Sequence, residues 1–290
     1  MTSLVLEPKE FRLLEGLWLN PRKSFGGRVR GERLTQKKGV SIDFADYREY
    51  SEGDDLRHLD WNVLARLDAA IMKTYRDEED LAVYLLLDLS ESMTFGEPPK
   101  VEAARRLACA LGYAGLNGGD AVFVRRLGVR ERPPTVRRGR ANYPRLANDL
   151  QEDRTGAGEL GAAIKDFGAS SVRPGLVIIL SDGLDPEITN AIRLLGGRGH
   201  EILFLQILSA VELDPDLEGD LRLLDAESGQ AVEITANSFA LKEYRRRLTE
   251  HNDALAEAVR RIGGRYVQVR SDTTTEAFLR GPARREGWVI

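Results

Sequence analysis

Two short segments of the sequence carry side-chain oxygens that could hold a divalent cation. The first is Asp88-Leu89-Ser90-Glu91-Ser92, in which one carboxylate and two hydroxyls are spaced by two residues. The second is Asp182-Gly183, which lies almost a hundred residues further along the chain. Carboxylate and hydroxyl oxygens are ligands that suit a hard ion such as Mg²⁺ or Mn²⁺. The residue types therefore predict a metal site formed by Asp88, Ser90, Ser92 and Asp182.

A plainer structural role is open for both segments. Asp88 and the two serines could cap a turn at the start of a helix, and Asp182 could be a turn residue before Gly183. Their positions favour the metal site, because each segment directly follows an apolar run that has the length of a buried strand. These runs are Leu81–Leu87 and Leu176–Leu180.

The elements that must position these residues alternate from about residue 81 onward. Short apolar runs predict strands over Leu81–Leu87, Ala121–Leu127, Leu176–Leu180, Glu201–Leu208 and Arg265–Val269. Between them, helical patterns cover Lys100–Leu116, Tyr143–Gln151, Leu160–Phe167, Ile188–Leu195, Ser238–Ile262 and Thr275–Leu279. Thr135–Arg138 could form a partner strand, and Leu221–Ile234 reads as a hairpin. The pattern predicts an α/β fold with a doubly wound, mainly parallel sheet, whose sites form at the carboxyl ends of the strands.

The first 80 residues have a different composition, which is polar, rich in arginine and weakly periodic. We expect residues 1–80 to form an N-terminal extension packed on a core domain of residues 81–290, with a helix over Phe11–Trp18. Residues 43–66 interleave acids, arginines and aromatics. This mixture predicts an ion-pair network with Trp61 packed as its anchor.

Two stretches resemble known families. The run from Leu85 to Met93 resembles the metal-ion-dependent adhesion site (MIDAS) of von Willebrand factor A domains, which have a Rossmann-like fold. Upstream, four motifs resemble the signature of the bacterial domain-of-unknown-function-58 (DUF58) family: Tyr47-Arg48-Glu49-Tyr50, Gly53-Asp54-Asp55-Leu56-Arg57, Asp60-Trp61 and Ala65-Arg66.

These resemblances imply a function and a second set of site residues. Members of the family are similar to proteins that accompany MoxR-type AAA+ ATPases, which implies a chaperone-like role in the assembly, maturation or regulation of other proteins. The binding residues that the family motifs imply are Arg48, Gly53, Asp54, Asp55, Arg57, Asp60, Trp61 and Arg66. Where the A-domain pattern has a threonine, this sequence has Gly158, with Thr155 and Glu159 nearby. Glycine offers no side-chain oxygen, so Mg²⁺ or Mn²⁺ is expected to bind weakly or not at all.

Several function classes compete at this stage. We favour a protein-binding module that is not an enzyme. The sequence has no Gly-x-x-x-x-Gly-Lys-Ser/Thr loop for nucleotide phosphates. The first alternative is a metal-dependent hydrolase, for which Glu91 or Glu159 would have to act as the base. The single cysteine, Cys109, lies in an apolar stretch and is expected to be a buried residue rather than a nucleophile.

A second alternative is a nucleic-acid binder driven by the arginines between Arg125 and Arg145. The formal net charge of −4 and the thin supply of aromatics in this stretch argue against it. A solvated hairpin or a protein-docking edge is the preferred interpretation. The first ten residues lack the pattern of a secretory signal, and the apolar runs are too short to cross a bilayer. We therefore expect a cytoplasmic protein with no membrane span.

Overall fold

The protein is described here from a computed structural model. The structure describes residues 6–25, 44–51, 56, 59–75, 81–127, 136–151, 160–170, 172–226 and 229–290. These residues form two compact units. Residues up to 23 and from 81 onward belong to the first unit, and residues 24–80 belong to the second. The segment before residue 24 belongs to the same unit as the sheet. The division of the chain at residue 80 and the packing of the extension on the core stay predictions.

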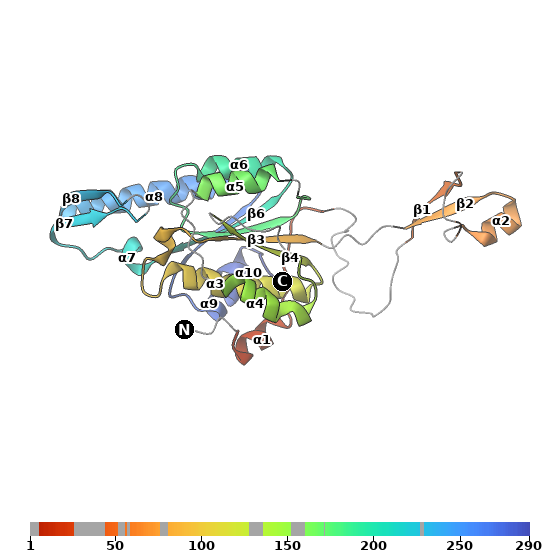
Figure 1. Cartoon of the computed structure of the whole chain (residues 1–290), viewed down its shortest axis with the longest axis horizontal. Helices are drawn as coiled ribbons and strands as arrows, with labels where there is room; N and C mark the ends of the chain where they lie inside the picture. The colour runs from red at the N-terminus through yellow and green to blue at the C-terminus, as the bar shows by residue number, and fades with distance from the viewer. Residues whose placement is uncertain are drawn as a thin grey trace. The chain divides into compact units, whose positions relative to one another are not determined.

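A five-stranded parallel sheet forms the centre of the first unit (Figure 1). Its strands, in spatial order, are β4 (Ala121–Leu127), β3 (Ala82–Asp88), β5 (Leu176–Ser181), β6 (Glu201–Leu208) and β9 (Arg265–Arg270). Every residue of β3, β5 and β6 is buried. Continuous apolar runs form such strands because helices cover both faces of a parallel sheet. The predicted α/β fold with a mainly parallel sheet is confirmed.

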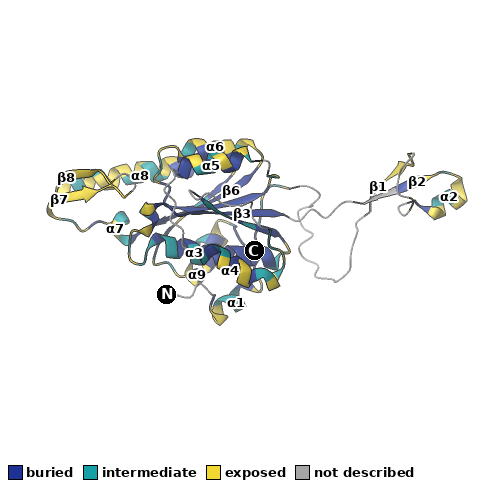
Figure 2. Ribbon diagram, viewed as in Figure 1, coloured by how far each residue is buried: buried dark blue, intermediate teal, exposed yellow. Residues whose placement is uncertain are grey.

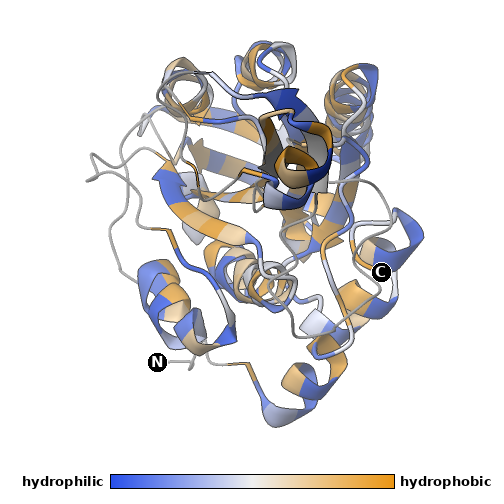
Figure 3. Ribbon diagram, turned by 90° about the vertical axis from the view of Figure 1, so that its right-hand side faces the viewer, coloured by the Kyte–Doolittle hydropathy of each residue, from blue (hydrophilic) through white to orange (hydrophobic). Residues whose placement is uncertain are grey.

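Helices lie on both faces of the sheet. On one face lie α3 (Lys100–Asn117) and α4 (Tyr143–Gln151), and on the other lie α5 (Leu160–Ala169), α6 (Ile188–Gly197) and α8 (Ser238–Arg261). Figure 2 shows the strands of the five-stranded sheet buried and the outer helix surfaces exposed. In Figure 3 the strands of this sheet are mainly hydrophobic, whereas the helices alternate hydrophobic and hydrophilic stripes. This is the amphipathic pattern from which the helices were predicted.

Short elements complete the first unit. They are α1 (Pro8–Leu14), the 3-10 helices η3 (Glu91–Thr94) and η4 (Arg140–Asn142), α7 (Ala210–Leu213), the antiparallel strands β7 (Gly219–Leu224) and β8 (Ala231–Ala236), α9 (Thr275–Arg280) and α10 (Pro282–Arg285). The β7–β8 pair confirms the predicted hairpin. Thr135–Arg138 was predicted as a partner strand. The structure has a single bridge there, between Arg137 and Val122, and Thr135 lies outside the described residues.

The first helix begins earlier than the sequence pattern indicated. It covers Pro8–Leu14 rather than Phe11–Trp18, because a proline at the first helical position starts it and a capping box at Glu7 and Glu10 closes its first turn. The chain after it is extended, and Leu19 pairs with Val289 near the end of the chain. Phe11 meanwhile packs edge-on against Tyr113 of α3.

The second unit contains the strands β1 (Phe44–Glu49) and β2 (Ile71–Tyr75), which pair antiparallel, and the helix α2 (Trp61–Leu67). Asp60 begins this helix, since its side chain accepts hydrogen bonds from the backbone N–H groups of Asn62 and Val63. In the parts of the chain that the structure describes, no helix has the length and apolarity needed to cross a bilayer.

Candidate functional site

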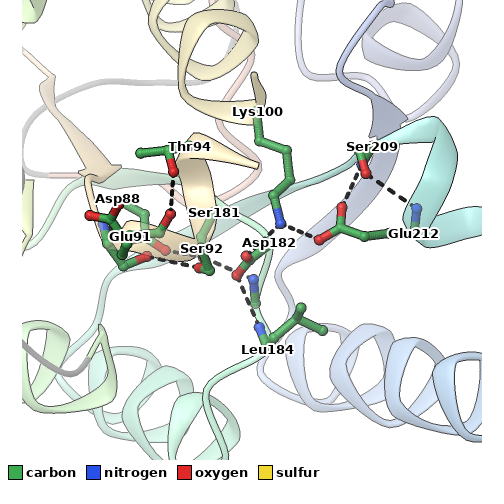
Figure 4. A network of polar contacts seen from close by, with 12 residues as sticks. Asp88, Glu91, Ser92, Thr94, Lys100, Ser181, Asp182, Leu184, Ser209 and Glu212 are labelled. Carbon is green, nitrogen blue, oxygen red and sulfur yellow. Dashed lines mark hydrogen bonds and ion pairs between the residues drawn. The ribbon is translucent and has the colours of Figure 1, made fainter. Parts of the chain in front are cut away.

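The two acidic segments lie next to each other at the carboxyl edge of the sheet (Figure 4). Strands β3 and β5 are neighbours, and Leu87 is in register with Leu180. The last residues of these strands, Asp88 and Ser181, therefore leave the sheet side by side. Ser181 Oγ donates a hydrogen bond of 2.6 Å to Asp88 Oδ2. This contact joins the loop after β3 to the loop after β5.

The chain turns sharply after β3 and brings the two serine hydroxyls together. The backbone N–H of Ser90 donates to Asp88 Oδ1 at 3.0 Å, which closes the first turn. Ser90 Oγ and Ser92 Oγ are then hydrogen-bonded at 3.1 Å. Met93, which is fully buried, fixes the 3-10 turn η3 that carries Ser92. Both serines therefore have a defined place beside Asp88.

Asp88 is held in an environment that disfavours its negative charge. The residue is only 2% exposed. Burial first, and the neighbouring negative charge of Asp182 second, together raise the pKa of Asp88 to about 6. The hydrogen bonds from Ser181 and Ser90 oppose this rise, since they stabilise the carboxylate.

Asp182 is fixed by contacts on both of its oxygens. Its Oδ1 accepts the backbone N–H of Leu184 at 3.2 Å, and its Oδ2 forms a 2.8 Å ion pair with Lys100 Nζ. The same ammonium forms a second ion pair with Glu212 Oε1. Glu212 belongs to a capping box on α7, in which its other oxygen accepts the N–H of Ser209 at 2.7 Å.

The loop after β5 is also tied to α8. Gln206 of β6 donates to the carbonyl of Asp182 at 2.8 Å and to Asn252 Oδ1 of α8 at 2.9 Å. One residue earlier on α8, His251 Nε2 hydrogen-bonds the carbonyl of Gly183 at 2.8 Å. The position of Asp182 therefore depends on contacts from α3, α7 and α8.

The donor set on the β3 side fits a divalent ion. Two neighbouring ligands of an octahedral Mg²⁺ with bonds of about 2.1 Å lie about 3.0 Å apart. The two serine hydroxyls are 3.1 Å apart, with Asp88 beside them. The described residues contain no group of three or more His, Cys, Asp or Glu side chains that could hold a metal. Any ion at this edge would therefore depend on the hydroxyls, as the sequence predicts.

The plainer structural role is present as well. Asp88 Oδ1 closes its own turn and Asp182 Oδ1 closes the turn before Leu184. Each of these carboxylate oxygens has a second lone pair, so a turn contact does not exclude a cation. The segment that holds Thr155, Gly158 and Glu159 lies outside the described residues. The metal ligands therefore stay a prediction.

The residues of the family motifs lie in the second unit. Asp60 is 5% exposed and caps α2, with Tyr47 Oη hydrogen-bonded to its Oδ2 at 3.5 Å. Arg66 is exposed. Trp61 is 60% exposed, so the prediction that it is a packed anchor is wrong: it occupies the first position of α2 and presents its ring outward.

The ion-pair network itself stays a prediction. Arg48 Nη1 donates to the carbonyl of Glu49 at 3.3 Å. Gly53, Asp54, Asp55 and Arg57 lie outside the described residues.

Sequence reasoning missed Lys100, Ser181 and Glu212. Lys100 opens an otherwise apolar helical pattern, and a charged residue there is normally exposed. The Ser209-x-x-Glu212 spacing is a capping-box signal that could have placed Glu212 at a helix start. Ser181 stands directly before Asp182 and ends a strand, so the alternation of the strand would have placed it on the opposite side from Asp182.

The fold and the site define an α/β protein with a hydroxyl- and carboxylate-lined site at the carboxyl edge of a parallel sheet. A family model described as "Protein of unknown function DUF58" matches residues 46–254, which is most of the chain. The chain belongs to this family, as the motifs upstream of the sheet predict.

Relatives of the chain occur in mycobacteria. The uncharacterized proteins Rv1480 of Mycobacterium tuberculosis and Mb1516 of Mycobacterium bovis are each 27% identical to it over 276 residues, which is 92% of this chain and 86% of each relative.

Two solved structures from Bacteroides match part of the chain. The conserved hypothetical protein BatB from Bacteroides thetaiotaomicron matches with a TM-score of 0.42 and 16% identity, over 71% of this chain and 96% of that chain. An aerotolerance-related membrane protein from Bacteroides fragilis matches with a TM-score of 0.40 and 18% identity, over 69% and 97%. At these values the likeness carries no argument about function.

Proposed function

We propose that this protein is a protein-binding module in which Asp88, Ser90, Ser92 and Asp182 hold Mg²⁺ or Mn²⁺ for the carboxylate of a partner. The charge balance at the carboxyl edge is the observation that carries this proposal. Two buried carboxylates lie there, those of Asp88 and Asp182, and the ion pair described for them involves one cation, Lys100, which Asp182 shares with Glu212. Buried negative charge of this kind favours a cation.

The chemistry of the donors suits binding better than hydrolysis. The Ser90 and Ser92 hydroxyls are neutral, so an ion held by them and one or two aspartates would keep a net positive charge and free coordination positions. An Asp or Glu side chain of another protein could occupy such a position. The proposed fold is correspondingly of the von Willebrand factor A type, with Asp88, Ser90 and Ser92 in its first loop and Asp182 in its third.

The proposed partner is a MoxR-type AAA+ ATPase or the client of that ATPase. The resemblance stated for the family motifs supports this partner. The sequence has no loop of its own for nucleotide phosphates. Energy for remodelling a client would therefore have to come from another protein.

The test is capture of a purified MoxR-type ATPase from the same genome by the immobilised full-length chain. The variants are wild type, Asp88→Asn and the control Asp253→Asn, which removes an exposed carboxylate from α8. Each is measured with Mg²⁺ and with EDTA. We expect wild type and the control to capture the ATPase in Mg²⁺ only, and Asp88→Asn to fail in both. Equal capture under all conditions would show that the metal edge is not the docking site. No capture by any variant would remove the ATPase as the partner.

The same protein preparations separate the two alternative functions. A metal-dependent hydrolase would turn over a phosphoester or ester substrate with Mn²⁺ and lose this turnover in Glu91→Gln. A nucleic-acid binder would show affinity that falls steeply with salt. In the described part of the arginine stretch, Arg137 is already engaged by Asp149 through a 3.0 Å ion pair, which favours the protein-binding module.

A further inference from the structure

Lys100 lies at the site, and its side chain is fully buried. It is 0% exposed, and its Nζ lies 2.8 Å from Asp182 Oδ2 and in direct contact with Glu212 Oε1. Figure 4 shows the ammonium between these two carboxylates. A buried ammonium is tolerated only where carboxylates pair with it, so Lys100 depends on Asp182 and Glu212 for its charge.

The position of Lys100 in its helix makes this dependence stronger. It is the first residue of α3. The N-terminal end of a helix carries partial positive charge and disfavours a cation. The helix terminus therefore does not stabilise the ammonium of Lys100. Among the described residues, Asp182 and Glu212 are the carboxylates that pair with it.

The two carboxylates are not free to follow a moving ammonium. The second oxygen of Asp182 accepts Leu184 N–H, and the second oxygen of Glu212 accepts Ser209 N–H. These backbone contacts fix the distance between the two carboxylates that Lys100 bridges. Lys100 therefore occupies a fixed cation position at Asp182, one of the residues that the proposed metal site would use.

We propose that the Lys100 ammonium is an internal counter-ion that competes with the divalent cation for Asp182. The proposal rests on the metal site proposed above. In the metal-free protein, Lys100 neutralises Asp182 and keeps the acidic edge folded. When a divalent ion is bound, Lys100 gives up Asp182 and keeps Glu212. The ion has to displace a charge that is already in place, so Lys100 lowers the metal affinity of this edge in addition to any effect of Gly158.

The first experiment measures Mn²⁺ affinity by calorimetry on the full chain. The variant is Lys100→Met, which keeps a long side chain without charge. The control is Lys165→Met, which removes an ammonium that also pairs with a carboxylate, Glu187, but is 42% exposed. We expect Lys100→Met to bind Mn²⁺ at least about tenfold more tightly than wild type, whereas the exposed control changes by less than about twofold because solvent screens its charge.

A second experiment covers the case in which Lys100→Met fails to fold. The ¹⁵N signal of a buried lysine ammonium is followed in the wild-type protein during titration with Mg²⁺. We expect one protected ammonium signal that shifts or broadens as Mg²⁺ binds, because Lys100 loses one of its two carboxylates.

The possible results separate this inference from the proposed function. Mg²⁺ binding that leaves the ammonium signal unchanged, or equal Mn²⁺ affinity in wild type and Lys100→Met, would overturn the inference and leave the metal site standing. If neither wild type nor Lys100→Met binds Mn²⁺, Lys100 is not what limits binding, and both the inference and the metal in the proposed function are wrong.

Discussion

Replacement of Asp88 by asparagine should stabilise the protein in the absence of divalent ions. Folding raises the pKa of Asp88 from 3.8 to about 6 because the carboxylate is buried beside Asp182. A pKa shift of about two units corresponds to at most about 3 kcal/mol against the ionised form in the folded state. Asparagine has the same shape, is uncharged, and retains an oxygen for the N–H of Ser90. The Asp88→Asn variant therefore avoids this cost near neutral pH.

The effect has a defined pH dependence. Because the pKa of Asp88 is raised on folding, the folded state binds this proton more tightly than the unfolded state does. The stability that protonated Asp88 contributes is complete below about pH 4 and is lost as the pH rises through about 6. The difference between Asp88→Asn and wild type should therefore be largest above pH 7 and nearly vanish at pH 4.

Urea unfolding in EDTA at a series of pH values measures this difference, with Asp88→Ala as a comparison that also leaves a cavity. With Mg²⁺ at pH 7.5, wild type should gain stability from the ion and Asp88→Asn should not. The reasoning is refuted if Asp88→Asn is less stable than wild type in EDTA at pH 7.5. It is equally refuted if the difference between the two proteins does not change between pH 4 and pH 8.

Two further predictions concern residues away from the site. Glu201→Gln should destabilise the protein by about 3–5 kcal/mol in urea unfolding, because it leaves Arg265, which is 2% exposed, without its buried partner at the amino edge of the sheet. Trp288→Ala should cost about 3–5 kcal/mol because Trp288 is fully buried, whereas Trp61→Ala, at a residue 60% exposed, should change the melting temperature little. Equal losses in the two tryptophan variants would place Trp61 in a packed interface.

The sheet and the neighbouring positions of the loops after β3 and β5 could be predicted from the sequence, because they depend on apolar runs and on a topological rule. Runs such as Leu176–Leu180 are long enough for a buried strand and too short for a helix, and parallel strands place their carboxyl ends at one edge. The hairpin over Leu221–Ile234 could also be predicted, since alternating polar and apolar residues and a turn that contains glycine indicate two paired strands.

The lysine and glutamate at the site could not be predicted in the same way. The contact between Lys100 and Glu212 joins residues 112 positions apart. No local pattern encodes such a pair, because it depends on how the starts of two helices converge above the sheet. The prediction for Trp61 was wrong for a related reason. A large aromatic residue among charges suggests burial, but Trp61 lies at the start of a short helix with no buried residue, and this position leaves it exposed.

The two edges of the sheet hold buried charge in different ways, and the difference bears on function. At the amino edge, Glu201 is matched: one oxygen accepts Arg265 at 2.6 Å and the other accepts the backbone N–H groups of Arg22 and Lys23 at 2.7 Å. Each described oxygen of Glu201 thus has a donor, and these contacts hold the segment before residue 24 against the sheet.

At the carboxyl edge, Lys100 forms ion pairs with two carboxylates. Asp88 has hydroxyl and backbone partners, and its pKa is raised. The contacts described for Asp88 include no cation, and folding alone would favour an apolar residue in place of a buried carboxylate without one. The divalent ion that we propose for this edge would offset that cost, which is why its removal should matter at Asp88 and not at Glu201.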